Sequence, residues 1–426
     1  MRFKTLQEWL DWQETLHPSE IELGLERVDK VWQQLNPERL TSVVITIAGT
    51  NGKGSSAAIT ESILLAAGYS VGCYTSPHLL KYNERIRVNG RPVSDQEICD
   101  AFNRVDLARK KSSLTYFEFG TLAALDIFAG AELDAVILEV GLGGRLDAVN
   151  IIDPDVALIT TIDIDHTDWL GSTRDEIALE KAGIMRPGRP AVFASSNPPQ
   201  ALLERAAELN VELYLAGDAF SYSRTDEGWS WQGPQTKYQY MPEPSAMGGF
   251  ILQNCSAVLM VLELLQERLE ITKGYVESGM LALYVPGRFQ VINGDVTIVL
   301  DVAHNPEAAT ELAANLSKLS PKGRNLAVFS ALADKDIVHI VEPLVALIDQ
   351  WHIGELEVKR AATLKQLQDS LIAAGVDRSE IHLYESLSQA QTKAMADAVT
   401  HDKLIIFGSF FTIAEAMQHS KIIKLA

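Results

Sequence analysis

A glycine-rich loop between an apolar run and a helical pattern constrains this chain most. Residues 43–48 form a short apolar run rich in β-branched side chains, which predicts a buried strand. Three glycines and Lys53 follow within residues 49–54, and apolar residues then recur at helical spacing. A strand, a glycine loop and a helix N-terminus together present backbone N–H groups to phosphate. The stretch therefore predicts an ATP-binding phosphate loop.

The loop offers a residue for each part of a nucleotide site. Lys53 would carry charge toward the β- and γ-phosphates, and Ser55 or Ser56 would offer a hydroxyl to Mg²⁺. The spacing departs from the common G-x-x-x-x-G-K-[ST] pattern, because Ile47 takes the first glycine's place and Gly54 separates lysine from serine. A glycine-rich turn without a ligand is the alternative. The residues expected to contact ATP are Gly49, Thr50, Asn51, Gly52, Lys53, Gly54 and Ser55.

Size and charge exclude several classes of protein. A chain of 426 residues exceeds the length at which one core usually keeps growing, so we expect two domains. The net charge of −19 argues against nucleic-acid or anionic-lipid partners. The three cysteines have no paired spacing, and neither a signal peptide nor a membrane-spanning run is visible. A soluble cytoplasmic protein is the expectation.

Polar residues follow several predicted strands near the loop. Glu139 ends the apolar strand at 134–140, and His166 follows the strand at 156–162. Ser76 comes after a strand that ends at Tyr74. In an open parallel sheet, ligands bind beyond the carboxyl ends of the strands. We therefore expect the loop, Glu139 and His166 to converge on a site for Mg²⁺ and ATP.

Two charged residues lie on apolar helical faces. Lys181 shares a face with Ile177 and Ile184 in a predicted helix at 173–184. Such a lysine either extends its ammonium group to solvent or becomes a neutral amine, which can react with CO₂ to form a metal-binding carbamate. Glu118 lies in a nearly all-apolar helix at 115–128 and needs a partner, either a structural cation or a polar ligand.

Two further local patterns predict secondary structure. Ser19 and Glu22 predict a capping box that opens a helix reaching about Leu35. Asn89 and Gly90, within residues 85–93, predict a tight hairpin of type I′.

Beyond a hinge at 284–289, strands and helices alternate afresh. The first strand there ends in the run from Asp301 to Pro306, in which capping explains Asn305 and Pro306 but not Asp301 and His304. Ser409 follows the last strand, at 403–407, in an equivalent position. These residues predict a substrate site in a second α/β domain, so the predicted domains are 1–286 and 287–426. Asn254, within a buried helix at 249–265, must also find polar partners.

Several motifs together are similar to those of a known family. The chain resembles the bacterial dihydrofolate synthase/folylpolyglutamate synthases of the Mur ligase superfamily over nearly its full length. The motifs are GTNGKGS at 49–55, TSPHL at 75–79, LEVGLGGRLD at 138–147, DHTDWLG at 165–171, EKAG at 180–183 and DVAHNP at 301–306. The resemblance implies a P-loop ATPase-like domain with a mostly parallel sheet, followed by a smaller Rossmann-like α/β domain that ligates glutamate.

The resemblance also implies roles for residues. Asn254, Arg288 and Asp301 would complete the nucleotide site begun by the phosphate loop. Mg²⁺ would bind at Ser76, Glu139 and His166, and Lys181 would be carbamylated and hold a second Mg²⁺. A monovalent cation could accompany them. The pterin substrate would lie near Gly24, Leu25, Glu26, Arg27, Phe117, Glu118, Phe119, Gly120, Leu146, Asp147 and Ala148, with Ser409 as a substrate residue in the second domain.

The implied reaction is ATP-driven addition of L-glutamate to dihydropteroate and to folates through an acyl phosphate, by a monomeric enzyme. Lys53, Lys181 and His304 are the expected catalytic residues. A folylpolyglutamate synthase without activity on dihydropteroate is the main alternative. A cell-wall Mur ligase needs a nucleotide-sugar domain, and too few residues precede Gly49 for one. A P-loop switch protein would leave the second domain and Lys181 unexplained.

Overall fold

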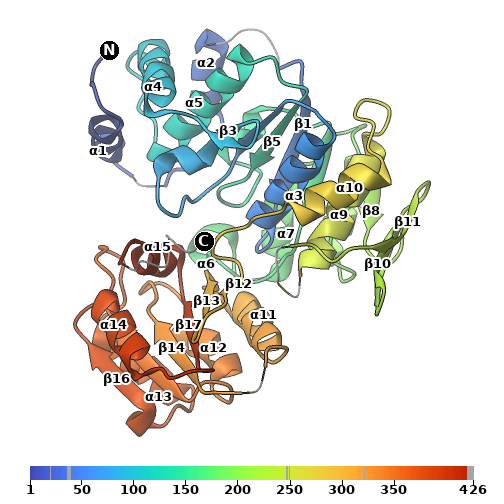
Figure 1. Cartoon of the computed structure of the whole chain (residues 1–426). Coiled ribbons are helices and arrows are strands. Elements are labelled where there is room, and N and C mark those ends of the chain that lie inside the picture. The colour runs from blue at the N-terminus through green and yellow to red at the C-terminus, as the bar shows by residue number, and fades with distance from the viewer. Residues whose placement is uncertain (20, 36–39, 246–247, 249, 321, 420–426) are drawn as a thin grey trace. The chain divides into compact units, whose positions relative to one another are not determined.

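The computed structural model describes residues 1–19, 21–35, 40–245, 248, 250–320 and 322–419. The chain divides into two compact units (Figure 1). The first comprises Met1–Pro244 and Leu252–Leu283, and the second comprises Ser245–Ile251 and the chain from Tyr284 onward. The chain therefore enters the second unit at Ser245, returns to the first unit at Leu252 and enters the second unit again at Tyr284.

A mixed sheet forms the centre of the first unit. Among the described residues its eight strands have the order β4-β3-β2-β5-β1-β6-β7-β8. The five pairs β2-β5, β5-β1, β1-β6, β6-β7 and β7-β8 are parallel, whereas β3 pairs antiparallel with both β2 and the edge strand β4. The strands are β1 Val43–Ala48, β2 Val71–Tyr74, β3 Ile86–Val88, β4 Arg91–Pro92, β5 Ala135–Glu139, β6 Val156–Ile159, β7 Ala191–Phe193 and β8 Leu213–Leu215.

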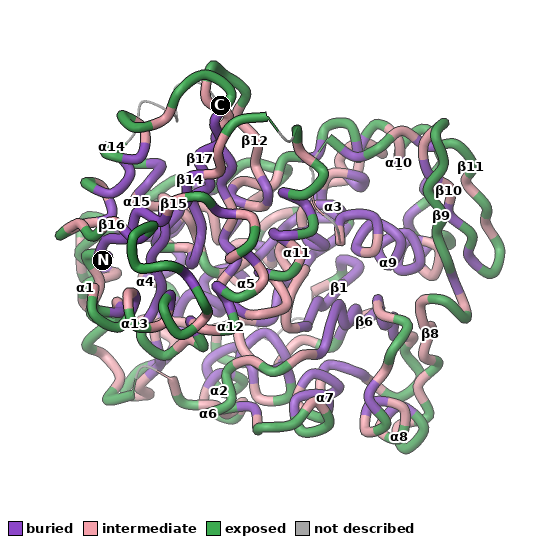
Figure 2. Tube along the Cα trace, turned by 90° about the horizontal axis from the view of Figure 1, so that it is seen from below, coloured by how far each residue is buried: buried purple, intermediate pink, exposed green. Residues whose placement is uncertain are grey.

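Helices flank this sheet and bury it. They are α1 Leu6–Leu16, α2 Glu26–Leu35, α3 Lys53–Ala66, α4 Asp95–Arg109, α5 Tyr116–Gly130, α6 Thr167–Leu170, α7 Arg174–Ala182, α8 Gln200–Glu208, α9 Ile251–Leu264 and α10 Lys273–Leu281, with the 3₁₀ turns η1 Tyr82–Arg85 and η2 Ala148–Ile151. Every residue of β1 is buried, as Figure 2 shows. A strand buried on both faces explains why residues 43–48 are apolar, except for Thr46, instead of alternating between apolar and polar.

The local predictions hold in most of this unit. The strand, loop and helix of the phosphate loop are confirmed as β1, the turn at 49–52 and α3. The hairpin is confirmed, since Asn89 and Gly90 have φ of 52° and 73° between antiparallel β3 and β4. Thr115 caps α5 with a capping box, and Thr173 does the same for α7.

The predicted start of the second helix is wrong. Ser19 opens no helix, and α2 begins only at Glu26, so Gly24 and Leu25 precede the helix. The side chain of Glu22 instead bonds His17 and Arg27, each five residues away, in place of the predicted capping contact with Ser19. The helix predicted at 249–265 is confirmed from Ile251 to Leu264, and its expected first residue, Gly249, lies outside the described residues.

A small antiparallel sheet follows β8. In the described ranges it has the order β11-β10-β9, built from β9 Ser221–Thr225, β10 Gly228–Gln232 and β11 Lys237–Met241. Trp229 and Trp231 of β10 are fully buried, whereas every residue of β9 is exposed (Figure 2).

The second unit has its own sheet and its own core. Within the part of the chain that is described, the sheet has six strands in the order β12-β13-β17-β14-β15-β16, parallel except for β12. The strands are β12 Gln290–Ile292, β13 Thr297–Asp301, β14 Asn325–Phe329, β15 Gln350–Gly354, β16 Ile381–Tyr384 and β17 Lys403–Phe407. The helices are α11 Pro306–Leu316, α12 Ile337–Val341, α13 Leu364–Ala373, α14 Leu387–Asp397 and α15 Phe410–His419, with the 3₁₀ turns η3 Glu342–Leu344 and η4 Arg378–Glu380.

The described helices include none that is long and apolar enough to cross a membrane.

Candidate functional site

The phosphate loop has a backbone that only glycine allows at two positions. Gly49 has φ of 152°, and a Cβ there would lie 1.8 Å from Oγ1 of Thr160. Gly52 has φ of 87° and stands as the N-cap of α3, whose first residue is Lys53. The Nζ of Lys53 bonds the carbonyl oxygens of Gly49 and Thr50 at 2.9 and 3.3 Å. The ammonium group therefore folds back over its own loop, at the positive end of a buried helix.

Two threonines after β6 hold the loop in place. The Oγ1 of Thr160 donates to the carbonyl of Asn51 at 2.5 Å, and the Oγ1 of Thr161 accepts the N–H of Asn51 at 3.0 Å. The N–H of Thr50 donates to the carbonyl of Thr161 at 2.8 Å. These contacts fix the loop between β1 and β6, which are neighbours in the sheet. The sequence reasoning missed both threonines, and their only signal was a polar pair directly after an apolar strand.

Asn254 lies directly against the loop. A Cβ on Gly52 would be 2.7 Å from the Asn254 Oδ1 and 3.2 Å from its Nδ2. The side chain of Asn254 is buried, and α9 carries it. The helix thus presents an amide to the turn where the phosphate loop enters α3.

Ser76 and Glu139 lie together beside the same loop. The N–H of Ser76 donates to the Glu139 Oε2 at 3.0 Å. A Cβ on Gly54 would be 3.7 Å from both carboxylate oxygens of Glu139, so this buried carboxylate faces the start of α3. His166 opens α6 in a left-handed conformation, with its Nε2 3.8 Å from Asp165. The carboxyl ends of β2, β5, β1 and β6 thus place all three residues at one edge of the sheet.

This donor set fits a hard divalent cation. Within the described part of the chain, no three His, Cys, Asp or Glu side chains gather as a closed metal site. Mg²⁺ usually takes one or two carboxylates and completes its coordination with phosphate oxygens and water. A buried carboxylate beside a serine and a phosphate loop suits that mode of binding.

Lys181 is buried, and it lies near the loop that follows β5. Its side chain is only 3% exposed. A Cβ on Gly144 would be 3.2 Å from the Lys181 Cα, and the N–H of Arg145 donates to the Glu180 carbonyl at 2.8 Å. The glycines of this loop thus let it pack closely against the last turn of α7.

The same loop ends in a buried carboxylate. Asp147 accepts the N–H groups of Leu142 and Val149 at 2.8 and 3.0 Å. Burial raises the pKa of Asp147 to about 6, while those N–H groups and the charge of Lys53 act in the opposite direction. A buried carboxyl group with this pKa can take up or release a proton close to neutral pH.

The three segments expected to bind pterin meet in the structure. Helix α2 contacts both α5 and η2, and α5 contacts η2. The Phe117 ring lies under the loop after β5, where a Cβ on Gly141 would be 2.6 Å from it. The Tyr74 ring also packs against that ring, with a centroid distance of 6.0 Å. These contacts bring Arg27, Phe117 and Asp147 into one region.

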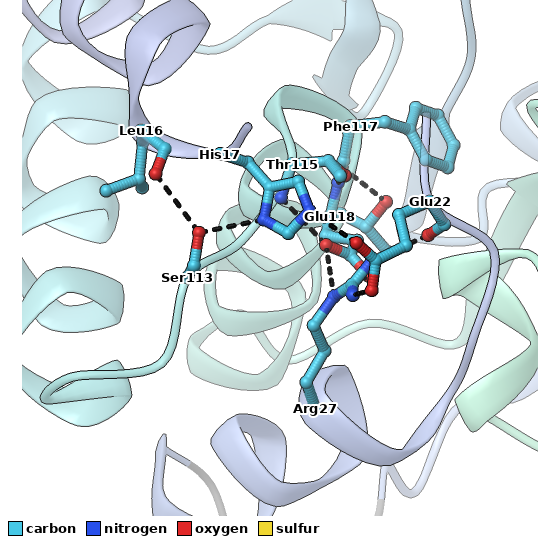
Figure 3. A network of polar contacts seen from close by, with 9 residues as sticks. Leu16, His17, Glu22, Arg27, Ser113, Thr115, Phe117 and Glu118 are labelled. Atoms are coloured by element: carbon cyan, nitrogen blue, oxygen red, sulfur yellow. Dashed lines mark hydrogen bonds and ion pairs between the residues drawn. The ribbon is translucent and has the colours of Figure 1, made fainter. Parts of the chain in front are cut away.

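Glu118 has a protein partner. The Nε of Arg27 donates to its two carboxylate oxygens at 2.8 and 3.0 Å, and the N–H of Thr115 donates to it at 2.7 Å (Figure 3). Arg27 also bonds Glu22, whose carboxylate contacts His17. The structural ion pair, one of the two alternatives for this residue, is therefore present.

The predicted residues of the second unit also converge. The N–H of Phe289 donates to the Asp301 Oδ2 at 2.8 Å, and the Arg288 guanidinium lies 5.1 Å from the Phe410 ring centroid. The His304 ring lies 6.0 Å from the same ring. Burial raises the pKa of Asp301 to about 6, against the charge of Arg288. Phe410, which directly follows Ser409 in the sequence, thus joins Arg288 and His304.

Ser409 has a structural role. Its Oγ accepts the N–H of Thr412 at 3.0 Å and shares a hydrogen bond with the Thr412 hydroxyl at 2.7 Å. This contact orders the first turn of α15. The residue nonetheless stands at the carboxyl end of β17, next to that of β13, as its predicted position requires.

Family models match both units. Residues 47–261 match the Mur ligase middle domain, and residues 287–410 match the Mur ligase glutamate ligase domain. The dihydrofolate synthase/folylpolyglutamate synthase of Escherichia coli K12 is 41% identical over 97% of this chain and 95% of its own length. The chain belongs to the dihydrofolate synthase/folylpolyglutamate synthase group of the Mur ligase family.

Solved structures of this group of Mur ligases share the whole fold. The Escherichia coli protein FolC in complex with DHPP and ADP has a TM-score of 0.93 and 41% identity, covering 99% of this chain and 98% of that one. A Yersinia pestis folylpolyglutamate synthase/dihydrofolate synthase complexed with AMPPNP and Mn has a TM-score of 0.90 and 43% identity, covering 97% and 98%. The present Mur ligase is accordingly an ATP-dependent ligase with two α/β domains.

Proposed function

We propose that this ligase adds L-glutamate both to dihydropteroate, which yields dihydrofolate, and to the γ-carboxylate of folates. The observation that carries the proposal is the meeting of α2, α5 and η2, which supports a second substrate site formed by these three elements. The relatives named for both activities support it. The match of the second unit to the Mur ligase glutamate ligase domain supports L-glutamate as the amino-acid substrate.

The proposed reaction has two steps. An oxygen of the substrate carboxylate attacks the γ-phosphorus of ATP, which forms an acyl phosphate and releases ADP. The amine of L-glutamate then attacks the acyl carbon, loses a proton and expels inorganic phosphate. The protein mainly positions the reactants and neutralises charge.

Each candidate residue has a stated task in this proposal. Lys53 and the N–H groups of the phosphate loop bind the β- and γ-phosphates, while Asn254, Arg288 and Asp301 complete the nucleotide site. Phe117 and Asp147 hold the pterin ring by packing and hydrogen bonding. His304 orients the phosphate or the incoming amine, and Ser409 belongs to the same edge of the second sheet.

Mg²⁺ would be held by Ser76, Glu139 and His166, with a second ion at a carbamate on Lys181. When bound, these ions stabilise the negative charge of the phosphoryl group in transfer. The burial of Lys181 supports carbamylation, because desolvation favours the neutral amine that reacts with CO₂. A monovalent cation belongs to the same proposal. The enzyme would act as a monomer in the cytoplasm, where ATP and L-glutamate are supplied.

Phosphate release tests the proposal directly. Purified protein with ATP, Mg²⁺ and L-glutamate should release phosphate when either dihydropteroate or tetrahydrofolate is added. Release with tetrahydrofolate alone would make the protein a monofunctional folylpolyglutamate synthase and would remove the pterin roles of Phe117 and Asp147. No release with either acceptor, in protein that binds AMPPNP, would overturn the assignment of substrates.

A further inference from the structure

Arg85, the last residue of η1, lies beside the loop that carries the candidate metal ligand Ser76. The N–H of Thr75, directly before Ser76, donates to the Arg85 carbonyl at 2.9 Å. The Nε of Arg85 donates to the Nδ1 of His78 at 2.8 Å, so this ring nitrogen carries no proton and the imidazole is neutral in this contact. All of these residues belong to the first unit. The Arg85 guanidinium group is therefore held close to the loop that would bind Mg²⁺.

Two tyrosine rings also contact this guanidinium group. Its central carbon lies 5.4 Å from the ring centroid of Tyr82 and 5.8 Å from that of Tyr116. The two rings meet edge to face, with their centroids 5.8 Å apart. Tyr116 is the first residue of α5 and directly precedes Phe117, the proposed pterin residue. Arg85 therefore contacts both the loop of the candidate metal site and the start of the helix that would bind the pterin.

The charge of Arg85 has no carboxylate partner within the described part of the chain. Arg27 and Arg87 of the same unit each form an ion pair with a buried carboxylate at 2.8 Å. Glu84, next to Arg85 in the sequence, instead accepts the backbone N–H groups of residues 79–81. A half-buried cation without an anion is unfavourable, because burial removes part of its hydration. This position is therefore suited to an anion that comes from outside the protein.

The edge of the guanidinium group is available for such an anion. Of its nitrogens, only Nε has a hydrogen-bond acceptor among the described residues. The remaining N–H groups of an arginine form a planar fork that fits the two oxygens of a carboxylate. Contacts with aromatic faces hold the plane of the group without using these N–H groups. The geometry therefore favours a carboxylate ligand.

The two acceptors of the proposed reaction differ in the carboxylates that they carry. Dihydropteroate has one carboxylate, and that group receives the phosphoryl group. A folate carries a glutamate, so its α-carboxylate remains as a second anion when its γ-carboxylate is phosphorylated. The two carboxylates of one glutamate are only a few bonds apart. An anion that binds Arg85 would likewise lie near Ser76, because Thr75 joins the two residues.

We propose that Arg85 binds the α-carboxylate of the glutamate that a folate acceptor carries. Arg85 is then a specificity-determining residue, which favours the extension of folates over the formation of dihydrofolate. The proposal rests on the proposed function, since it concerns the second of the two acceptors.

The test measures phosphate release by full-length protein with ATP, Mg²⁺ and L-glutamate, while the concentration of each acceptor is varied. Arg85→Met keeps an unbranched side chain but removes the charge. The ratio of kcat/KM for tetrahydrofolate to kcat/KM for dihydropteroate should fall at least about tenfold, the size expected for losing a hydrogen bond between charged groups. Arg85→Lys keeps the charge and should restore part of the ratio. Arg91→Met removes an exposed arginine of the neighbouring strand β4 and should leave the ratio as it is.

The α-amide of tetrahydrofolate, in which an uncharged amide replaces the α-carboxylate, tests the contact from the side of the ligand. The unaltered protein should use this amide at least about tenfold less well than tetrahydrofolate, whereas Arg85→Met should no longer distinguish the two.

Two results would overturn the proposal: equal use of the amide and of tetrahydrofolate by the unaltered protein, or an unchanged ratio of the two acceptors in Arg85→Met. The first comparison needs no variant, so it decides the matter should Arg85→Met not fold. It also does so if the unaltered protein accepts tetrahydrofolate but not dihydropteroate. If the unaltered protein releases phosphate with neither acceptor, the proposed function itself fails.

Discussion

Single residues at the phosphate loop leave little freedom for change. Gly49 is fixed twice, by its backbone conformation and by the Oγ1 of Thr160, which occupies the place a side chain would need. Lys181 is fixed by burial, and Glu139 by its contact with Ser76. At each of these positions the space available and the neighbouring charge limit which residue types the structure accepts. A single substitution tests each limit.

Gly49→Ala should destabilise the protein by about 3 kcal/mol or more, since Thr160 would have to move and would release Asn51. The measurement is urea denaturation. Gly130→Ala is the control, because Gly130 ends α5 with open space around it, and its stability should be unchanged or higher by up to about 1 kcal/mol. Equal stability of the two variants would contradict the account of the loop.

Lys181→Ala should lower kcat at least about a hundredfold, the size typical of losing a group that stabilises a transition state. Formate, which resembles the carbamate head, should restore part of the activity. In the unaltered protein, ¹³CO₂ should give a carbamate NMR signal that Lys181→Ala lacks, while the exposed Lys111→Ala keeps it. A fully active Lys181→Ala would exclude the carbamate from the reaction.

Between elements, polar pairs far apart in sequence decide how the helices are arranged. Arg27 joins α2 to Glu118 of α5, and Glu61 of α3 pairs with Arg87 of β3 at 2.8 Å. Such pairs contribute most through the cost of breaking them, because removing one partner leaves a buried charge without compensation.

Arg27→Ala should lower the free energy of unfolding by about 2–3 kcal/mol, because the side chain of Glu118 is only 5% exposed. Arg205→Ala removes an arginine from an exposed pair on α8 and should cost less than about 1 kcal/mol. Urea denaturation of both variants gives the comparison. A loss of dihydropteroate binding without a loss of stability would instead make the pair part of the substrate site.

His352 of β15 should make the second unit sensitive to acid. Burial, aided by the neighbouring His382 and the charge of Arg324, lowers the pKa of His352 to about 4, while Asp397 acts in the opposite direction. Histidine in the unfolded chain has a pKa near 6.5, so between about pH 6.5 and 4 the unfolded chain binds more protons than the folded protein. The free energy of unfolding therefore decreases as the pH is lowered through this range. His352→Phe should remove about 2 kcal/mol of that fall.

The measurement is the free energy of unfolding at pH values from 7 to 4. His419→Gln, at an exposed position, should follow the unaltered protein throughout. Parallel curves for His352→Phe and the unaltered protein would place the acid sensitivity elsewhere.

The sequence predicts what depends on neighbours along the chain. Periodicity and turn chemistry suffice for β1, α3, the hairpin at Asn89 and the strand before Asp301. They also bring Asn254 and Glu139 to attention as buried polar residues. They miss the threonines that hold the phosphate loop, because these act on a segment more than a hundred residues away. They also miss the late start of α2, where Glu22 bonds His17 and Arg27 and makes no capping contact with Ser19.

At the scale of the whole molecule, each unit has a core of its own, so unfolding need not be a single transition. AMPPNP with Mg²⁺ should stabilise the first unit by about 2.7 kcal/mol at a hundred times its Kd. Calorimetry should therefore show a higher transition temperature for the first unit when AMPPNP and Mg²⁺ are present. The same transition should occur at a lower temperature in Gly49→Ala, because Gly49 belongs to the first unit. Lys53→Ala should abolish the shift, and an unchanged scan for the unaltered protein would contradict nucleotide binding at the loop.

Residues 245–251 belong to the second unit although they precede part of the first unit in the sequence. This order limits where the chain can be cut into two fragments that each hold one complete unit. A single cut after Leu283 would leave residues 245–251 of the second unit on the fragment that holds the first unit. That fragment would then carry Phe250, whose N–H donates to the carboxylate of Glu311 in α11. Recombination or domain exchange at one junction therefore cannot transfer the second unit intact. Chimaeras that exchange residues 245–251 together with the chain from Tyr284 onward should fold better than chimaeras that exchange only the later part.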